Sequence, residues 1–269
     1  MNSGRACLRW LPQRSWPFLI GGALLLVGCG SAVDRTMEQT FGESYHVAPN
    51  ATVSIRNTDG SIRIYGADTN EIKIQAIKKA YDRDRLDKIV INVAAQPSSV
   101  SIETTYPPKP KLGVSDRSGT VDYVLIVPQT CSISRVELVT GELLIEGMRG
   151  RKVHASLVNG HLIAHNCFGD LHLFVANGAL DVAYDWWEKR KFSVDATIVN
   201  GNARTFIPGD AAFHLVVTSD NGNVASEFTD KENRHHGARK IDSTIGAPSE
   251  AELTLHATNG SIRVAEVNP

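Results

Sequence analysis

The sequence predicts an all-β protein: a right-handed β-helix, or β-solenoid, in which strand–turn–strand repeats of about 20 residues stack on one another. A glycine preceded mostly by Asn, Asp or Thr recurs along the chain, and its middle copies follow at intervals of 19, 18, 23 and 21 residues. A period near 20 residues indicates repeating structural units. The recurring glycines are Gly60, Gly141, Gly160, Gly178, Gly201, Gly222 and Gly260.

The residues around these glycines alternate between apolar and polar. Five positions before the glycine and two positions after it, every copy carries an apolar side chain, whereas six positions before it most copies are polar. Alternation with a period of two indicates strands with one buried face. An Asn-Gly or Asp-Gly pair between two such runs favours a tight turn, since glycine accepts positive φ without cost. Successive units are expected to stack and bury their apolar faces.

The first 28 residues have the composition of an export signal. Three arginines and no acid precede an apolar run from Phe18 to Val27, which is too short to span a bilayer, and no comparable run follows. The segment Leu26-Val-Gly-Cys29 resembles the bacterial lipobox, which implies lipidation of Cys29. The alternative is a plain secretory signal with an incidental cysteine. Gly30 favours sorting to the outer membrane, with the protein facing the periplasm or the cell surface.

Residues 29–45 are expected to form a tether, and residues 46–268 a single adhesin-like β-solenoid domain. Its part from 46 to 128 lacks the period, although four strands are expected there, and 129–268 holds the regular repeats. A separate N-terminal domain remains an alternative. The segment Thr229–Glu250 is predicted to be an exposed insertion, since solenoids tolerate insertions at their corners. The four strands are expected at Ile72–Ile77, Ile89–Val93, Val100–Thr104 and Val121–Val127.

Several phrases of the repeat region carry a family resemblance. They are Val127-Pro128, Val139–Gly147, Ile198–Pro208 and Thr218–Val224. They resemble the bacterial "putative adhesin" domain family, a β-helical domain of unknown function, over about Val53 to Val264. The resemblance implies a fold more than an activity, because these motifs are structural.

Charge and motifs exclude several classes of function. Removing the first 28 residues removes three arginines and changes the formal net charge from −1 to −4, which does not favour a nucleic-acid partner. The chain has no Gly-x-Ser-x-Gly elbow, phosphate loop or Cys/His nucleophile arrangement. His235-His236 lacks a third ligand at suitable spacing. We therefore expect no enzyme activity, no metal and no cofactor.

Two groups of side chains are candidates for surface binding. His154 and His172 occupy the same outward column, with Arg135 and Asp195 on either side, so a stacked polar strip is expected. A solvated ladder face is the favoured interpretation, because no paired carboxylates and no cluster of Ca²⁺ ligands accompany the column. Trp186-Trp187 stands at a corner between two repeats, where one ring is expected to pack inward and the other to be exposed. The exposed ring is a candidate for stacking on a sugar or anchoring a partner, and the favoured alternative is that it only caps the edge of the core.

The leading hypothesis is a non-catalytic, lipid-anchored protein of the cell envelope, acting as an adhesin-like binding or scaffolding module. Its partners would be the membrane, through the anchor, and an envelope protein or polysaccharide. The alternatives are a β-helical carbohydrate-active enzyme resembling a polysaccharide lyase, and a periplasmic component that senses the state of the envelope. The spacing of Cys131 and Cys167 also predicts two free, largely buried thiols, because an intervening repeat keeps them too far apart for a disulfide.

Overall fold

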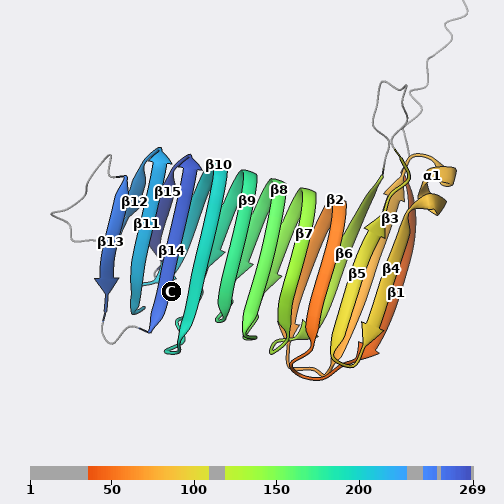
Figure 1. The fold of residues 1–269 in the computed structure, drawn as a ribbon, viewed down its shortest axis with the longest axis horizontal. Helices are drawn as coiled ribbons and strands as arrows, with labels where there is room; N and C mark the ends of the chain where they lie inside the picture. Colours follow the sequence, from red (N-terminus) through yellow and green to blue (C-terminus); the bar gives the residue numbers. More distant parts are fainter. Residues whose placement is uncertain (1–35, 109–118, 229–238, 247–249, 268–269) are drawn as a thin grey trace, which may run out of the picture. The chain divides into compact units, whose positions relative to one another are not determined.

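A computed structural model describes residues 36–108, 119–228, 239–246 and 250–267. It confirms the all-β class: the described residues form strands joined into one large sheet and a single six-residue helix (Figure 1). No helix among these residues is long and apolar enough to cross a membrane. The elements are β1 (Met37–His46), β2 (Thr52–Ala67), β3 (Glu71–Ala80), α1 (Arg83–Lys88), β4 (Val90–Gln96), β5 (Ser99–Thr105), β6 (Thr120–Pro128), β7 (Ser132–Glu146), β8 (Lys152–His165), β9 (Asp170–Ala183), β10 (Phe192–Pro208), β11 (Phe213–Asn221), β12 (Val224–Ser226), β13 (Lys240–Ile245), β14 (Ala251–Asn259) and β15 (Ile262–Val267).

The middle of the sheet consists of long parallel strands in register. β2, β7, β8, β9 and β10 are neighbours in that order, as Figure 1 shows. Their recurring glycines pair with one another, from Gly60 with Gly141 through to Gly178 with Gly201. Each strand continues through its glycine instead of breaking into two strands at a turn. The positive φ expected there is present, at +140° for Gly141 and +139° for Gly160.

The spacing of neighbouring strands explains why glycine is needed at this position. A Cβ on Gly141 would overlap the carbonyl oxygen of Gly60, and a Cβ on Gly160 would overlap that of Gly141. Any larger residue would have to push a neighbouring backbone away. The Asn-Gly signal in the sequence therefore reflects contact between strands as well as the conformation of each strand.

The two apolar columns predicted from the sequence are buried in every copy. Side chains from both sides of the glycine, such as Ile55 and Ile62 of β2, belong to one hydrophobic cluster. In β9, Leu173 is buried while its neighbour His172 is exposed, so the predicted register is confirmed. Burial of one such side chain contributes roughly 1.5–3 kcal/mol, and the core extends through all the central strands.

The order of the strands differs from the order of the sequence at both ends. The C-terminal repeat, β14 and β15, lies between β10 and β11 or β12 instead of beyond them. At the other end β2 pairs directly with β7, although more than 60 residues separate them in the chain. We expected the repeats to stack in the order of the sequence, and the structure shows a different order. Their similar edges allow copies that are distant in the chain to pair.

The irregular N-terminal part adds strands to the edge of β2. The four strands expected there are present as β3 to β6, and the charged segment before β4 contains α1. β6 and β5 pair in parallel with different halves of β2, and β3, β1 and β4 continue antiparallel. β1 overlaps the expected tether at 29–45. Within the expected insertion, β13 pairs antiparallel with β11, while residues 229–238 lie outside the described residues.

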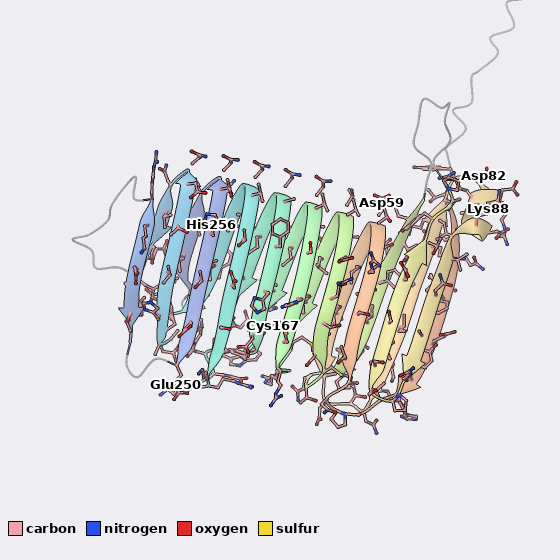
Figure 2. All side chains as sticks on the ribbon, viewed as in Figure 1. Asp59, Asp82, Lys88, Cys167, Glu250 and His256 are labelled. Atoms are coloured by element: carbon pink, nitrogen blue, oxygen red, sulfur yellow. The ribbon has the colours of Figure 1, made fainter. Side chains whose placement is uncertain are left out.

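Both predicted free cysteines are unpaired and buried, which confirms that expectation. Cys167 lies near the strand ends away from Asp59 (Figure 2), and its thiol donates weakly to the carbonyls of Ile145 and His165. Burial raises the pKa of the Cys131 thiol to about 11 and that of Cys167 to about 12. Both thiols are therefore protonated and poorly reactive at neutral pH.

We predict that Gly160→Ala lowers the free energy of unfolding by at least about 3 kcal/mol, because it adds a backbone clash to an unfavourable φ. Gly42→Ala in β1 is the matched control, since a Cβ there meets no atom within 4 Å. It should change stability by less than about 1 kcal/mol. Urea denaturation of the two variants measures the difference, and equal effects would contradict the role assigned to the glycine contacts.

Candidate functional site

The histidine strip predicted from the sequence lies on one face of β7 to β10. His154 of β8 pairs in register with His172 of β9, which pairs with Asp195 of β10. These three side chains and Arg135 of β7 line a single open hollow of about 380 Å³, together with Glu137 and Phe174. We call it the β7–β10 hollow. Four candidates from four neighbouring strands thus meet at one place.

The geometry of the β7–β10 hollow is set by the sheet register. The imidazole rings of His154 and His172 meet edge to face, with centroids 4.6 Å apart. His172 Nδ1 lies 3.7 Å from Asp195 Oδ2, and Arg135 Nε lies 3.5 Å from Glu137 Oε1. The pairing of β7 with β2 and with β8 shifts register just before Val136, in the segment that contains Arg135.

The surroundings of His154 favour its neutral form. Partial burial lowers the pKa of His154, and Coulomb interactions with Lys152 and His172 lower it further. His154 is therefore predominantly neutral at neutral pH. Phe174 is 40% exposed, which gives the hollow an aromatic surface beside these polar groups. The hollow can donate and accept hydrogen bonds and stack against a flat apolar group.

Trp186 and Trp187 lie outside this hollow, in the corner between β9 and β10. The structure confirms that one of the two tryptophan rings packs inward and the other is exposed. Trp187 packs against the rings of Tyr184, Phe192 and Phe213, with centroids 5.3 to 5.5 Å away. Trp186 is 46% exposed, and its Nε1 donates to Glu188 at 3.4 Å. Trp187 is thus a core side chain, and Trp186 is the one available to a partner.

A ladder of asparagine side chains runs along the strands beside the glycines. Each amide donates to the next: Asn177 to Asn159, Asn200 to Asn177, Asn259 to Asn200, and Asn221 to Asn259, at 2.9 to 3.0 Å. The recurring asparagines are visible in the sequence, where they predict a turn conformation but not contacts between strands. In-register stacking makes them a continuous hydrogen-bonded row.

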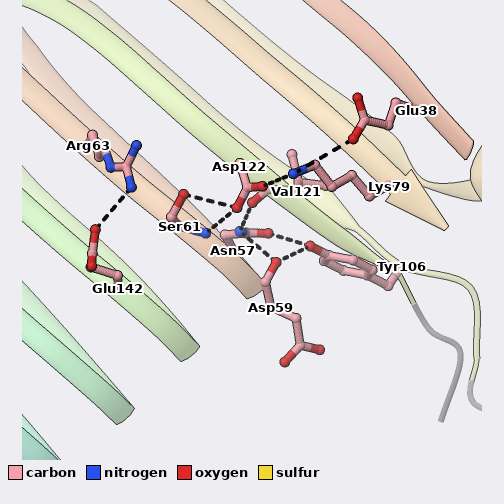
Figure 3. Close-up of polar contacts among 10 residues, drawn as sticks. All are labelled: Glu38, Asn57, Asp59, Ser61, Arg63, Lys79, Tyr106, Val121, Asp122 and Glu142. Atoms are coloured by element: carbon pink, nitrogen blue, oxygen red, sulfur yellow. Dashed lines mark hydrogen bonds and ion pairs between the residues drawn. The ribbon is translucent and has the colours of Figure 1, made fainter. Parts of the chain in front are cut away.

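A second hollow, which sequence reasoning missed, lies where β1, β3, β6, β2 and β7 meet. Its volume is about 860 Å³, and it is lined by two cations and two carboxylates with apolar side chains between them. We call it the β1–β7 hollow. Figure 3 shows its polar groups. Asp122 Oδ1 accepts from the Ser61 amide and hydroxyl, both at 2.9 Å, and Asp122 Oδ2 lies 3.1 Å from Lys79 Nζ.

Figure 3 also shows an ion pair in the lining of this hollow and a group of hydrogen bonds next to it. Arg63 Nη2 lies 3.2 Å from Glu142 Oε1, so this pair links β2 to β7. Behind the hollow, Asn57 Nδ2 donates to the carbonyls of Asp59 and Val121, and its Oδ1 accepts from Tyr106 at 2.7 Å. Only the sheet topology brings these residues together. No spacing in the sequence identifies them.

The remaining candidates for chemistry are ion pairs on the strand surface. Asp181 lies 2.9 Å from His161 Nε2 and also accepts a hydrogen bond from Arg204 Nε. His165 Nε2 lies 3.0 Å from Asp185. Within the described part of the chain, no group of three or more His, Cys, Asp or Glu side chains is arranged to hold a metal ion. Cys29 and His235-His236 fall outside that part.

No protein-family model matches the chain, and no curated protein matches it. The solved structures that resemble this chain include the following three. A putative cell adhesion protein from Clostridium sporogenes has 14% identity and a TM-score of 0.46, covering 85% of this chain and 100% of its own. A putative adhesin from Bacteroides fragilis has 10% identity and a TM-score of 0.29, covering 84% and 97%. A putative lipid binding protein from Parabacteroides distasonis has 9% identity and a TM-score of 0.31, covering 84% of this chain and 97% of its own.

The two tryptophans provide a direct test of the packing in this corner. Trp187→Ala should lower the free energy of unfolding by about 3 kcal/mol or more, because it removes a ring from the aromatic cluster. Trp186→Ala should cost about 1 kcal/mol, because this residue is 46% exposed and its ring lies 6.1 Å from that of Phe168. Thermal unfolding of both variants measures the costs. Similar losses for the two would mean that Trp186 is also part of the core.

Proposed function

We propose that the protein is a non-catalytic, lipid-anchored component of the cell envelope that acts as an adhesin-like binding module. The observation that carries the proposal is the β7–β10 hollow, where Arg135, His154, His172 and Asp195 line one open surface. Neighbouring parallel strands repeat their outward side chains at intervals of about 4.8 Å, so such a surface suits an extended partner. We infer that the partner is an acidic polysaccharide of the envelope.

The chemistry of the hollow supports this class of ligand. Arg135 presents a guanidinium that can bind a carboxylate in a bidentate manner. The exposed ring of Phe174 offers a flat surface for the apolar face of a sugar ring, and the imidazoles can bond to hydroxyl groups. The acids Glu137 and Asp195 hold Arg135 and His172 in place. Protonation of His154 below neutral pH would add a positive charge and strengthen the binding of an acidic chain.

The anchor and the winding of the chain are part of the same proposal. Leu26-Val-Gly-Cys29 supports lipidation of Cys29, and Gly30 supports an outer-membrane location facing the periplasm or the surface. We also propose that the strands wind as a right-handed β-helix. Pairing of the two halves of β2 with different strands, β5 and β6, supports two separate strand layers. A protein held in this way would present its long strand faces to the envelope.

A second candidate function is a polysaccharide lyase. The observation that favours it is His154, whose lowered pKa leaves a neutral imidazole near Arg135 at neutral pH. A lyase needs a base to remove the proton next to a uronic acid carboxylate, and a cation to neutralise that carboxylate. Formation of unsaturated products during incubation with polygalacturonate would show that the protein is a lyase and not a non-catalytic binding module.

We predict that polygalacturonate fragments bind to the full-length protein and that His172→Ala weakens this binding about tenfold, or about 1.4 kcal/mol. Thr254→Ala is the matched control, because Thr254 lies in the same outward column beyond Asp195 and outside the hollow. Its affinity should be unchanged. Calorimetric titration at neutral pH and at about pH 5.5 should show tighter binding at the lower pH, which is below the ordinary histidine pKa of about 6.5. If His172→Ala and Thr254→Ala bind polygalacturonate with equal affinity, the β7–β10 hollow is not the binding site.

Lipidation predicts that Cys29→Ser moves the protein from the membrane fraction to the soluble fraction and leaves the precursor uncleaved at this site. Two acyl chains provide stable attachment to a membrane, and the substitution removes their site of attachment. Cell fractionation with radiolabelled palmitate measures both effects. Cys131→Ser is a control that should leave fractionation unchanged, because this thiol is buried. Membrane partitioning that is unchanged in Cys29→Ser would disprove the anchor.

A further inference from the structure

The β1–β7 hollow takes no part in the function proposed above, although it is more than twice as large as the β7–β10 hollow. Its volume of about 860 Å³ lies in the range of ligand sites, roughly 300–1,000 Å³. Five strands from distant parts of the sequence contribute to its walls. Ile77 is 37% exposed there, so an apolar surface is open to solvent.

Both cations that line this hollow already have carboxylate partners. Lys79 is paired with Asp122 and lies 3.9 Å from Glu38 at the edge of the site, and Arg63 is paired with Glu142. The four charged side chains of the lining are between 31% and 45% exposed and can still reach a ligand. These two ion pairs are closer, at 3.1 and 3.2 Å, than the pairs that Arg135 and His172 form in the β7–β10 hollow at 3.5 and 3.7 Å, so a charged ligand would have to displace a tighter partner here. Hydroxyl groups, in contrast, can donate to the carboxylates and accept from the cations without separating the pairs.

The apolar lining and the open backbone define the rest of the site. Ile77, Val124 and Phe41 lie among the charged groups and can contact the carbon-bound hydrogens of a sugar ring. Gly42 leaves the hollow open, because a Cβ there would meet no atom within 4 Å. Alternating donors and acceptors around an apolar surface match an uncharged polyhydroxylated ring.

From this geometry we propose that the β1–β7 hollow is a second binding site, which takes a neutral oligosaccharide of about two to four sugar units. The Arg63–Glu142 and Lys79–Asp122 pairs bind the hydroxyl groups, and Ile77 and Val124 contact the ring faces. The site differs from the β7–β10 hollow in selecting an uncharged ligand. It does not depend on the function proposed for that hollow.

The test is calorimetric titration of the purified full-length protein, in a detergent without a sugar headgroup, with three trisaccharides. Chitotriose is neutral, its fully deacetylated form carries positive charge on the same skeleton, and trigalacturonate is anionic. We expect chitotriose to bind with a Kd below about 1 mM, and each charged ligand to bind at this site at least about tenfold more weakly. Failure of chitotriose to bind, or tighter binding of a charged ligand at this site, overturns the proposal.

Amino-acid substitutions test whether chitotriose binds in the β1–β7 hollow. Gly42→Leu should reduce chitotriose affinity at least about tenfold without loss of thermal stability, because the added side chain occupies open space. Thr254→Leu adds the same side chain outside both hollows and should have no effect on affinity. Glu142→Gln keeps the shape but leaves Arg63 without its ion pair, so it should weaken chitotriose and strengthen trigalacturonate. Wild-type chitotriose affinity in both Gly42→Leu and Glu142→Gln would place the binding elsewhere and overturn the proposal, even if polygalacturonate binds at the other hollow.

Discussion

The close approach of glycine backbones in neighbouring strands is the constraint on which the rest of this structure depends. At Gly141, Gly160 and Gly201 the backbone of the next strand occupies the space that a side chain would need. This contact fixes the register, because a shift by one residue would move a side chain into that space and turn every apolar side chain outward. Once the register is fixed, each position faces its own equivalent. Amides then stack on amides and imidazoles on imidazoles.

The periodic part of the fold could be predicted from the sequence because it depends on local alternation. Ile55, Leu173 and the other members of the apolar columns are buried as their positions indicated. The order of the strands could not be predicted. Gly260 fits against Gly201 as well as a sequential neighbour would, so similar repeats do not specify their own neighbours. The antiparallel strands β1 and β3 also lack the glycine marker, and their pairing follows from edges that only the folded chain presents.

The two hollows differ in how far the sequence reveals them. Aligning the repeats already places His154, His172 and Asp195 in one column, so their meeting follows from the register. The β1–β7 hollow depends on contacts between residues far apart in the chain, such as Ser61 with Asp122. It depends equally on a missing side chain at Gly42. Neither feature has a spacing that can be recognised in one sequence. Sites formed at the irregular end of a repetitive fold therefore require the tertiary structure.

The position of β14 between β10 and β11 also constrains the time course of folding. A ribosome releases β10 and β11 before β14, yet in the finished sheet β14 separates them. The edge of β10 must stay open, or reopen, until β14 and β15 have emerged. A truncated chain lacks the strand that joins β11 to the rest of the sheet. The strand that is released last of the three thus lies inside the finished sheet, and the sheet cannot mature until β14 has been released.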